Sequence, residues 1–246
     1  MLLKKFLRSI LLQGKFLHYW VPLIWDTHFV LSKPGNSSKP HIPLRNYYSG
    51  LTRYILNIKI EARIHKGHKE IRIVFFISNH QSNLDIFFVG PALPKRTVSL
   101  GKQSLVWVPI FGLMYWLSGN ILINRGNRKK AWQVMEGVAR TIKEDNCNVW
   151  IMPEGTRSKG RGLLPFKKGP FVVAIKGQVP IYPVVFSRYE DSFDLEKLKP
   201  GKVILEALEP ISTKGLTVSD IDKLMADTRE KMLGHINKLS QELKTN

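Results

Sequence analysis

Apolar and polar residues alternate along this chain with two different periods. Residues 58–64 (IKIEARI) are apolar at every second position, which predicts a β-strand with one buried face. Residues 71–77 (IRIVFFI) form a denser apolar run, which predicts a fully buried strand. Further strands are expected near residues 97–101, 120–124, 147–152, 179–186 and 202–208.

Helical periodicity fills the intervals between these strands. Helices are expected near residues 44–56, 84–92, 105–117, 128–144, 168–177 and 217–243. Strands that alternate with helices in this way predict an α/β fold, with a mixed central sheet flanked by helices. The chain contains no internal repeat and no second apolar body, so no other globular domain is expected.

Residues 1–43 have a different pattern. On a helix, Lys4, Lys5, Arg8 and Lys15 would lie on one side and most of the apolar residues on the other. The uncharged run FLHYWVPLIW is about half of the ~20 apolar residues that a membrane-spanning helix requires. The pattern predicts an N-terminal membrane-associated helical segment in the interface, followed by a Pro/Gly/Ser hinge. In the alternative interpretation, this helix packs on the protein's own core.

This pattern divides the chain into two parts. Residues 1–43 would form the interfacial segment and hinge, and residues 44–246 the globular body. The body is long enough for one sizeable core, and 43% of the 246 residues are hydrophobic.

Charge and cysteine content narrow the possible functions. The chain has 38 Lys and Arg against 19 Asp and Glu, a formal net charge of +19, which favours an anionic partner. Nucleic acid, a lipid surface and a phosphorylated substrate all meet that condition. The lone cysteine, Cys147, excludes an intramolecular disulfide framework and favours a reducing setting that faces the cytosol. No HExxH or similar spacing of metal ligands is present, so we expect no catalytic metal.

The segment SNHQSNLD (78–85) places His80 and Asp85 between a buried strand and a helix. On a helix these residues would lie ~140° apart, and on a strand they would face opposite sides, so only a turn lets them meet. The Ser and Asn residues around them are typical of such a turn. A carboxylate bonded to one imidazole nitrogen leaves the other free to take a proton. Alternatively, Asp85 only begins the helix and His80 is a loop histidine.

Cations follow other predicted strands. Lys102, Arg125 and Arg157 each come soon after the end of a strand, the last within the turn PEGTRS (153–158). Carboxyl ends of strands in α/β sheets are where sites form, so we expect these side chains near the His80/Asp85 turn. Cations beside a candidate base predict a site for a phosphorylated substrate that loses a proton.

Four segments in the chain resemble, in the right order, the sequence blocks of the glycerolipid acyltransferase family: NHQSNLD (79–85), GNILINR (119–125), IMPEGTRS (151–158) and VPIYPV (179–184). The resemblance covers roughly residues 55–210 and is strongest to bacterial 1-acylglycerol-3-phosphate acyltransferases. It implies transfer of an acyl group from acyl-CoA or acyl carrier protein to the free 2-hydroxyl of 1-acylglycerol 3-phosphate (lysophosphatidate), which gives phosphatidic acid. Glycerol 3-phosphate or another lysophospholipid is the alternative acceptor.

The resemblance also implies roles for individual residues. His80 would be the general base and Asp85 would orient it, with no acyl-enzyme intermediate. The substrate would be bound by Lys102, Arg125, Glu154, Gly155, Thr156 and Arg157. For Glu154 the alternative is to anchor its loop through backbone amides. No metal and no cofactor is expected, with the acyl thioester as co-substrate.

The expected partners are lysophosphatidate, the acyl thioester, acyl carrier protein as one possible donor, and an anionic membrane surface. This places the protein on the cytoplasmic face of a membrane, the inner membrane of a bacterium. In the loop SKGRGLLPFKKG (158–169), basic residues alternate with Leu163, Leu164 and Phe166, which suits contact with anionic lipid or coenzyme A phosphates. Alternatively, these apolar residues cap the core.

Two other classes of protein would also account for the positive charge, but other features of the sequence favour them less. A nucleic-acid-binding protein is not expected, because the chain has no RNP-like aromatic strand and no helix-turn-helix signature. A non-catalytic membrane-surface protein would leave the turn with His80 and Asp85 unexplained.

Overall fold

A computed structural model describes residues 58–64, 73–94, 96–108, 112, 115–116, 119–124, 126–144, 146–189 and 201–245. The predicted interfacial segment and hinge (1–43), the predicted helix at 44–56 and Arg125 lie outside the described residues. Among the residues that the structure describes, no helix is both long and apolar enough to cross a lipid bilayer.

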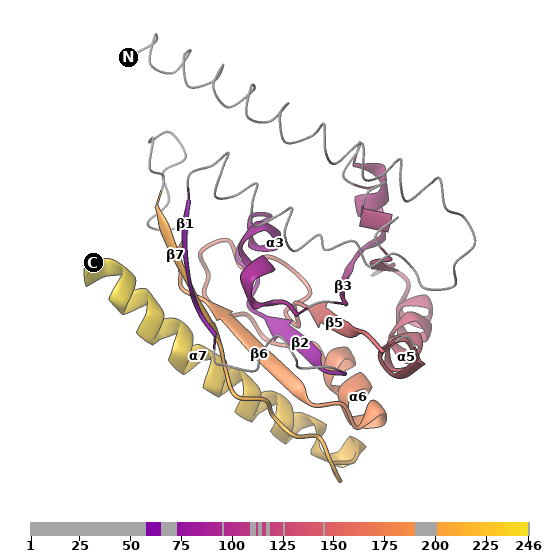
Figure 1. Cartoon of the computed structure of the whole chain (residues 1–246). Helices are drawn as coiled ribbons and strands as arrows, with labels where there is room; N and C mark the ends of the chain where they lie inside the picture. Colours follow the sequence, from indigo (N-terminus) through magenta and orange to yellow (C-terminus); the bar gives the residue numbers. More distant parts are fainter. Residues whose placement is uncertain are drawn as a thin grey trace.

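A mixed seven-stranded sheet forms the centre of the protein (Figure 1). Its strands lie in the order β1 (Lys59–Arg63), β7 (Lys202–Ala207), β6 (Ile181–Phe186), β2 (Phe75–Ser78), β5 (Asn148–Ile151), β3 (Thr97–Lys102) and β4 (Ile121–Ile123). Strands β6 and β7 are antiparallel, and every other neighbouring pair is parallel. The predicted α/β class with a mixed central sheet is confirmed.

Helices cover both faces of the sheet. The long helices α5 (Arg128–Glu144), α6 (Lys168–Gly177) and α7 (Ile221–Thr245) lie on one face, and the short α3 (Asp85–Phe88) lies on the other (Figure 1). Alternate side chains of β2 enter the two cores, because successive strand residues point to opposite faces. Phe75 and Ile77 pack with residues of α5, α6 and α7, whereas Phe76 packs with Phe88 of α3.

The structure corrects three of the predicted boundaries. The strand predicted at 71–77 begins at Phe75, because Ile73 has a φ of 58°, a left-handed conformation that cannot continue a strand. The helix predicted at 84–92 is α3 followed by the 3-10 turn η2 (Gly90–Ala92), where Pro91 supplies no N–H to continue α3. The helix predicted at 105–117 starts as the 3-10 segment η3 (Gln103–Trp107). The 3-10 segment ends at the extended Val108, which precedes a proline, and the described residues 112, 115 and 116 are helical again.

Other boundaries agree closely with the pattern. Helices α5 and α6 span the predicted residues, and the predicted C-terminal helix consists of the 3-10 turn η5 (Val218–Asp220) and α7. The ends of α5 and α6 were predictable because the spacing of apolar residues and the flanking turns both indicate where each helix begins and ends.

The sheet order brings three chain segments to one edge. Strand β2 lies between its parallel neighbours β5 and β6, with Ile77 opposite Ile151 and Ser78 opposite Val184. Because parallel strands end at the same edge, the segments that follow β2, β5 and β6 meet there. These segments contain the His80/Asp85 turn, the PEGTRS loop and residues 187–189.

Candidate active site

The turn after β2 brings His80 and Asp85 into contact, as its composition predicted. Nδ1 of His80 lies 2.7 Å from Oδ2 of Asp85. The Asp85 side chain is fully buried, whereas 18% of the His80 side chain is exposed. Asp85 is the first residue of α3, so the helix start fixes the carboxylate while the imidazole remains accessible.

Asp85 acts only as a hydrogen-bond acceptor. Its Oδ2 also accepts the backbone N–H groups of Gln81 (2.7 Å) and Ser82 (3.1 Å), and its Oδ1 accepts the hydroxyl of Tyr189. With both oxygens occupied by donors, the His80 Nδ1 must carry its proton toward Asp85. Within the described part of the chain Nε2 has no hydrogen-bond partner, so its lone pair is available to a substrate hydroxyl.

Two amide side chains tie the turn to the chain that follows β6. The Asn79 amide donates to the carbonyl of Phe186 (3.1 Å) and accepts the N–H of the same residue (2.8 Å). Gln81 donates to the carbonyl of Ser187 (2.9 Å) and accepts the N–H of Tyr189 (3.3 Å). We expected Asn79 to close its own turn, but its side chain bonds this distant segment, where Phe186 and Ser187 have backbone groups to satisfy.

Glu154 supports the same turn from the opposite side. Its Oε1 accepts the backbone N–H of His80 (2.6 Å), and its Oε2 accepts that of Leu164 (2.9 Å). Burial raises the pKa of Glu154 to about 7, the two N–H donors oppose this shift, and the nearby charge of Asp85 adds to it. Both oxygens of Glu154 are bonded to backbone amides. This geometry fits the alternative interpretation, in which Glu154 anchors its loop.

The loop after β5 lies directly against the turn. The N–H of Ser158 donates to the carbonyl of His80 (2.7 Å), and Nη1 of Arg157 donates to Oδ1 of Asn83 (3.0 Å). Gly155 has a φ of 68°, which favours glycine, and Thr156 is exposed. Within the described residues this one bond engages the Arg157 guanidinium, and the remaining N–H groups can bind an anion.

The other predicted cations are farther along the sheet edge or outside the described chain. Lys102 is the exposed last residue of β3, at the same edge as His80. Strand β5 separates β3 from β2, so the two strand axes are about 10 Å apart. Arg125 follows β4, the strand beyond β3, and is not among the described residues. The structure therefore brings Arg157 to the turn and leaves Lys102 at a distance that a large substrate could bridge.

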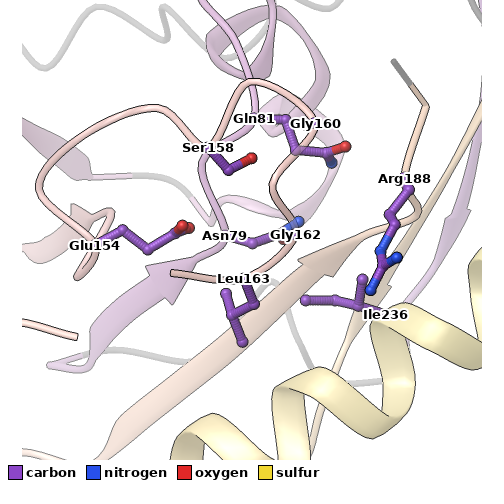
Figure 2. A pocket seen from close by; sticks show the side chains of 9 residues that line it. All are labelled: Asn79, Gln81, Glu154, Ser158, Gly160, Gly162, Leu163, Arg188 and Ile236. Carbon is purple, nitrogen blue, oxygen red and sulfur yellow. The ribbon is translucent and has the colours of Figure 1, made fainter. Parts of the chain in front are cut away.

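A small cavity lies behind the turn (Figure 2). Its volume is about 20 Å³, and its walls include Asn79, Gln81, Glu154 and Ile236 of α7. Such a volume holds about one water molecule. This cavity is therefore too small for an acyl chain.

The basic loop after PEGTRS does not present its apolar residues as expected. Leu163 and Phe166 are each only 7% exposed and belong to the core beneath the sheet. The ring of Phe166 stacks on that of Phe171 in α6, with centroids 5.9 Å apart. The interpretation of Leu163 and Phe166 as lipid-contacting residues is wrong, and the alternative, that they cap the core, is correct for these two residues. Leu164 is half-buried, and its contact with lipid stays a prediction.

Sequence reasoning missed Tyr189 and Gln81. Tyr189 is separated from Asp85 by 104 residues, and no local spacing connects them. One weak indication of Tyr189 is present in the sequence. This residue follows the strand of the fourth family-like segment, so it lies at the edge of the sheet where the site forms. Cys147 is buried in the core with 1% exposure.

Comparisons with known proteins show the family of this chain. A family model described as Acyltransferase matches residues 59–187, which include both His80 and Arg157. A 1-acyl-sn-glycerol-3-phosphate acyltransferase of Haemophilus influenzae is 43% identical, over 77% of this chain and 79% of its own length. A protein of the same description from Escherichia coli is 36% identical, over 89% of each chain.

A solved structure shows the same fold. The crystal structure of a 1-acyl-sn-glycerophosphate acyltransferase from Thermotoga maritima superimposes with a TM-score of 0.66. The match covers 93% of this chain and 97% of that one, at 19% sequence identity. Taken together, the matched model and the identities over most of the chain show that this protein is an enzyme of the acyltransferase family.

Proposed function

We propose that this enzyme transfers an acyl group to the 2-hydroxyl of 1-acylglycerol 3-phosphate and so forms phosphatidic acid. The donor is acyl-CoA or acyl carrier protein. The observation that carries the proposal is the 2.7 Å contact between Nδ1 of His80 and the buried Asp85, beside Arg157, whose guanidinium makes one hydrogen bond within the described residues. The names of the Haemophilus influenzae and Escherichia coli relatives support lysophosphatidate as the acceptor.

His80 acts as general base in this reaction. Its Nε2 takes the hydroxyl proton while the hydroxyl oxygen attacks the carbonyl carbon of the thioester. The tetrahedral intermediate then expels the thiolate, which leaves readily because a thiol has a pKa of ~8.5, and the imidazolium returns the proton to sulfur. Asp85 stabilises the imidazolium between these two steps. Acyl transfer is direct, so no acyl-enzyme forms.

The acceptor's phosphate binds to the cations at the sheet edge. Arg157 lies against the turn and offers a planar group of donors that matches two phosphate oxygens. Lys102 and Arg125 complete the phosphate site from the ends of the neighbouring strands. Gly155 and Thr156 shape the glycerol pocket, and the Glu154 carboxylate holds their loop in place through the His80 and Leu164 amides.

The enzyme works at the cytoplasmic face of a membrane, where both its acceptor and its product are lipids. The +19 net charge supports binding to anionic lipid, and residues 1–43 supply the interfacial segment. The exposed Lys159, Arg161, Lys167 and Lys168 suit the phosphates of coenzyme A or the acidic surface of acyl carrier protein. The reaction needs no metal and no further cofactor.

Acceptor preference tests this proposal directly. Purified protein in detergent would be assayed with lysophosphatidate, glycerol 3-phosphate, a lysophosphatidylcholine and a monoacylglycerol, each with acyl-CoA and with acyl carrier protein. We expect transfer to lysophosphatidate to have the highest kcat/KM, because this acceptor alone combines a phosphate monoester with one acyl chain. Faster transfer to glycerol 3-phosphate would support the alternative acceptor. Equal use of monoacylglycerol would contradict the phosphate site.

A further inference from the structure

Tyr189 lies immediately behind the His80/Asp85 pair. It follows β6, has 1% exposure, and its hydroxyl donates to Oδ1 of Asp85. The same hydroxyl lies 3.0 Å from Oγ of Ser82. Its ring packs edge-on against Phe88 of α3, with centroids 4.9 Å apart and an interplanar angle of 85°. Ring and hydroxyl are therefore held separately.

Counting protons fixes the direction of these hydrogen bonds. A tyrosine hydroxyl has one proton, and Asp85 is an acceptor only, so the Tyr189 proton points to Asp85. Ser82 must then donate its own hydroxyl proton to Tyr189, while its Oγ accepts the N–H of Leu84 (3.0 Å). The bonds run in one direction from the start of α3 to the carboxylate, and each strengthens the next.

We infer that Tyr189 is a positioning residue that sets the orientation of the Asp85 carboxylate toward His80; this inference rests on the proposed role of His80 as base. Nδ1 of His80 meets only Oδ2, so the carboxylate plane decides where the imidazole points. Tyr189 holds the opposite oxygen, Oδ1, and thereby resists rotation of the plane. Its hydroxyl also stabilises the buried negative charge of Asp85, which lies near the carboxyl of Glu154.

Tyr189→Phe tests this inference, because it removes one hydroxyl and keeps the ring against Phe88. We expect kcat to fall about tenfold, the effect of losing a hydrogen bond to a charged group, with the KM of both substrates unchanged. Without the hydroxyl, the Asp85 carboxylate loses one hydrogen-bond donor, so its negative charge stabilises the imidazolium more strongly. The acid limb of the pH–rate profile should therefore move to higher pH. A residue with only a structural role would lower the folded fraction and leave this limb in place.

Tyr182→Phe is the matched control. Tyr182 is equally buried, on β6, and its ring lies 4.9 Å from that of Phe76, away from Asp85. We expect its kcat and pH profile, per folded protein, to match the wild type. In an Asp85→Asn background, Tyr189→Phe should cause no further loss, because both act through the same carboxylate.

Two outcomes would overturn the inference. One is an unchanged kcat and acid limb in folded Tyr189→Phe. The other is an equal further loss when the change is added to Asp85→Asn. Either result would leave the role of His80 intact, because that role fails only if folded His80→Ala retains activity.

Discussion

Glu154 accepts the backbone N–H of His80 at 2.6 Å, so the carboxylate of the PEGTRS loop holds the main chain of the candidate base. Its second oxygen holds Leu164 at 2.9 Å. A residue predicted to line the substrate pocket thus joins two loops that follow different strands. Because the carboxyl is buried, its protonation is coupled to the stability of the folded protein.

Protonation of Glu154 should make the stability depend on pH. Its pKa in the folded protein, about 7, lies above the ordinary value of 4.5. Between these values the folded protein keeps a proton that the unfolded chain releases. The stability gained in this way is complete below pH 4.5 and is lost as pH rises through about 7.

Thermal unfolding at pH 5 and pH 8 would measure this effect. Wild type should lose more stability over this interval than Glu154→Gln, whose amide does not titrate. Glu136→Gln is the control, because Glu136 is half exposed on α5 and should leave the wild-type slope unchanged. Equal slopes in wild type and Glu154→Gln would contradict the coupling.

His80→Ala should lower kcat by ~10²–10⁴ in folded protein, as expected when a general base is lost. The chain offers a matched control in His235, whose Nδ1 lies 2.8 Å from Glu206 but which projects from α7. His235→Ala should retain normal turnover, since Glu206 is on β7, which β6 separates from β2 and its His80/Asp85 turn. Steady-state assays per folded protein decide the matter, and near-normal turnover of His80→Ala would remove the base assignment.

Cys147→Ser tests the proposal of direct transfer. Cys147 is buried in the core, so its replacement should leave kcat per folded protein unchanged. Mass spectrometry of enzyme quenched during turnover should show no added acyl group. An inactive but folded Cys147→Ser protein would instead point to a covalent route.

Arg157→Ala should lower kcat/KM for lysophosphatidate by roughly ten- to a hundredfold, the range for a lost hydrogen bond to a charged group. Arg157→Lys should restore only part of this loss, because lysine cannot bind two oxygens in a plane. Activity on monoacylglycerol, which lacks the phosphate, should change little. Arg125→Ala is expected to behave in the same way. Lys176→Ala, a half-exposed cation on α6, is the control.

Residues 1–31 should hold the enzyme on a membrane without crossing it. High salt should release full-length protein from anionic vesicles only in part, because salt screens the basic residues but not apolar burial. Removal of residues 1–31 should release most of the protein, as measured by co-sedimentation. Protease access to a tag at Met1 would show its side of the membrane. A tag cut only from the side opposite the catalytic body would mean that the segment spans.

Burial changes one part of this membrane prediction. Phe166 is in the core, so Phe166→Ala should lower the free energy of unfolding by ~3–5 kcal/mol and leave vesicle binding of the folded protein unchanged. Trp107, with 82% exposure, is the better candidate for residual membrane contact after the N-terminal removal. Co-sedimentation of truncated Trp107→Ala should therefore show a further decrease.

The sequence by itself determined the alternation of elements and part of the site. Helices α5 and α6 and the ends of most strands followed from apolar periodicity, since that periodicity is local. The meeting of His80 and Asp85 was also predictable, because only four residues of a turn-forming segment separate them. Likewise, cations after strand ends could be expected at one sheet edge.

Only the tertiary structure decided which distant groups support that pair. Strand order placed β6 beside β2, which brought Tyr189 to Asp85 across 104 residues of sequence. The same order placed β5 on the other side and gave Glu154 its two backbone partners. Burial also decided the place of Phe166. A basic loop with apolar residues has the same sequence pattern whether its apolar side chains face lipid or the core. Such contacts depend on strand pairing and packing between remote segments, and periodicity along the chain does not encode them.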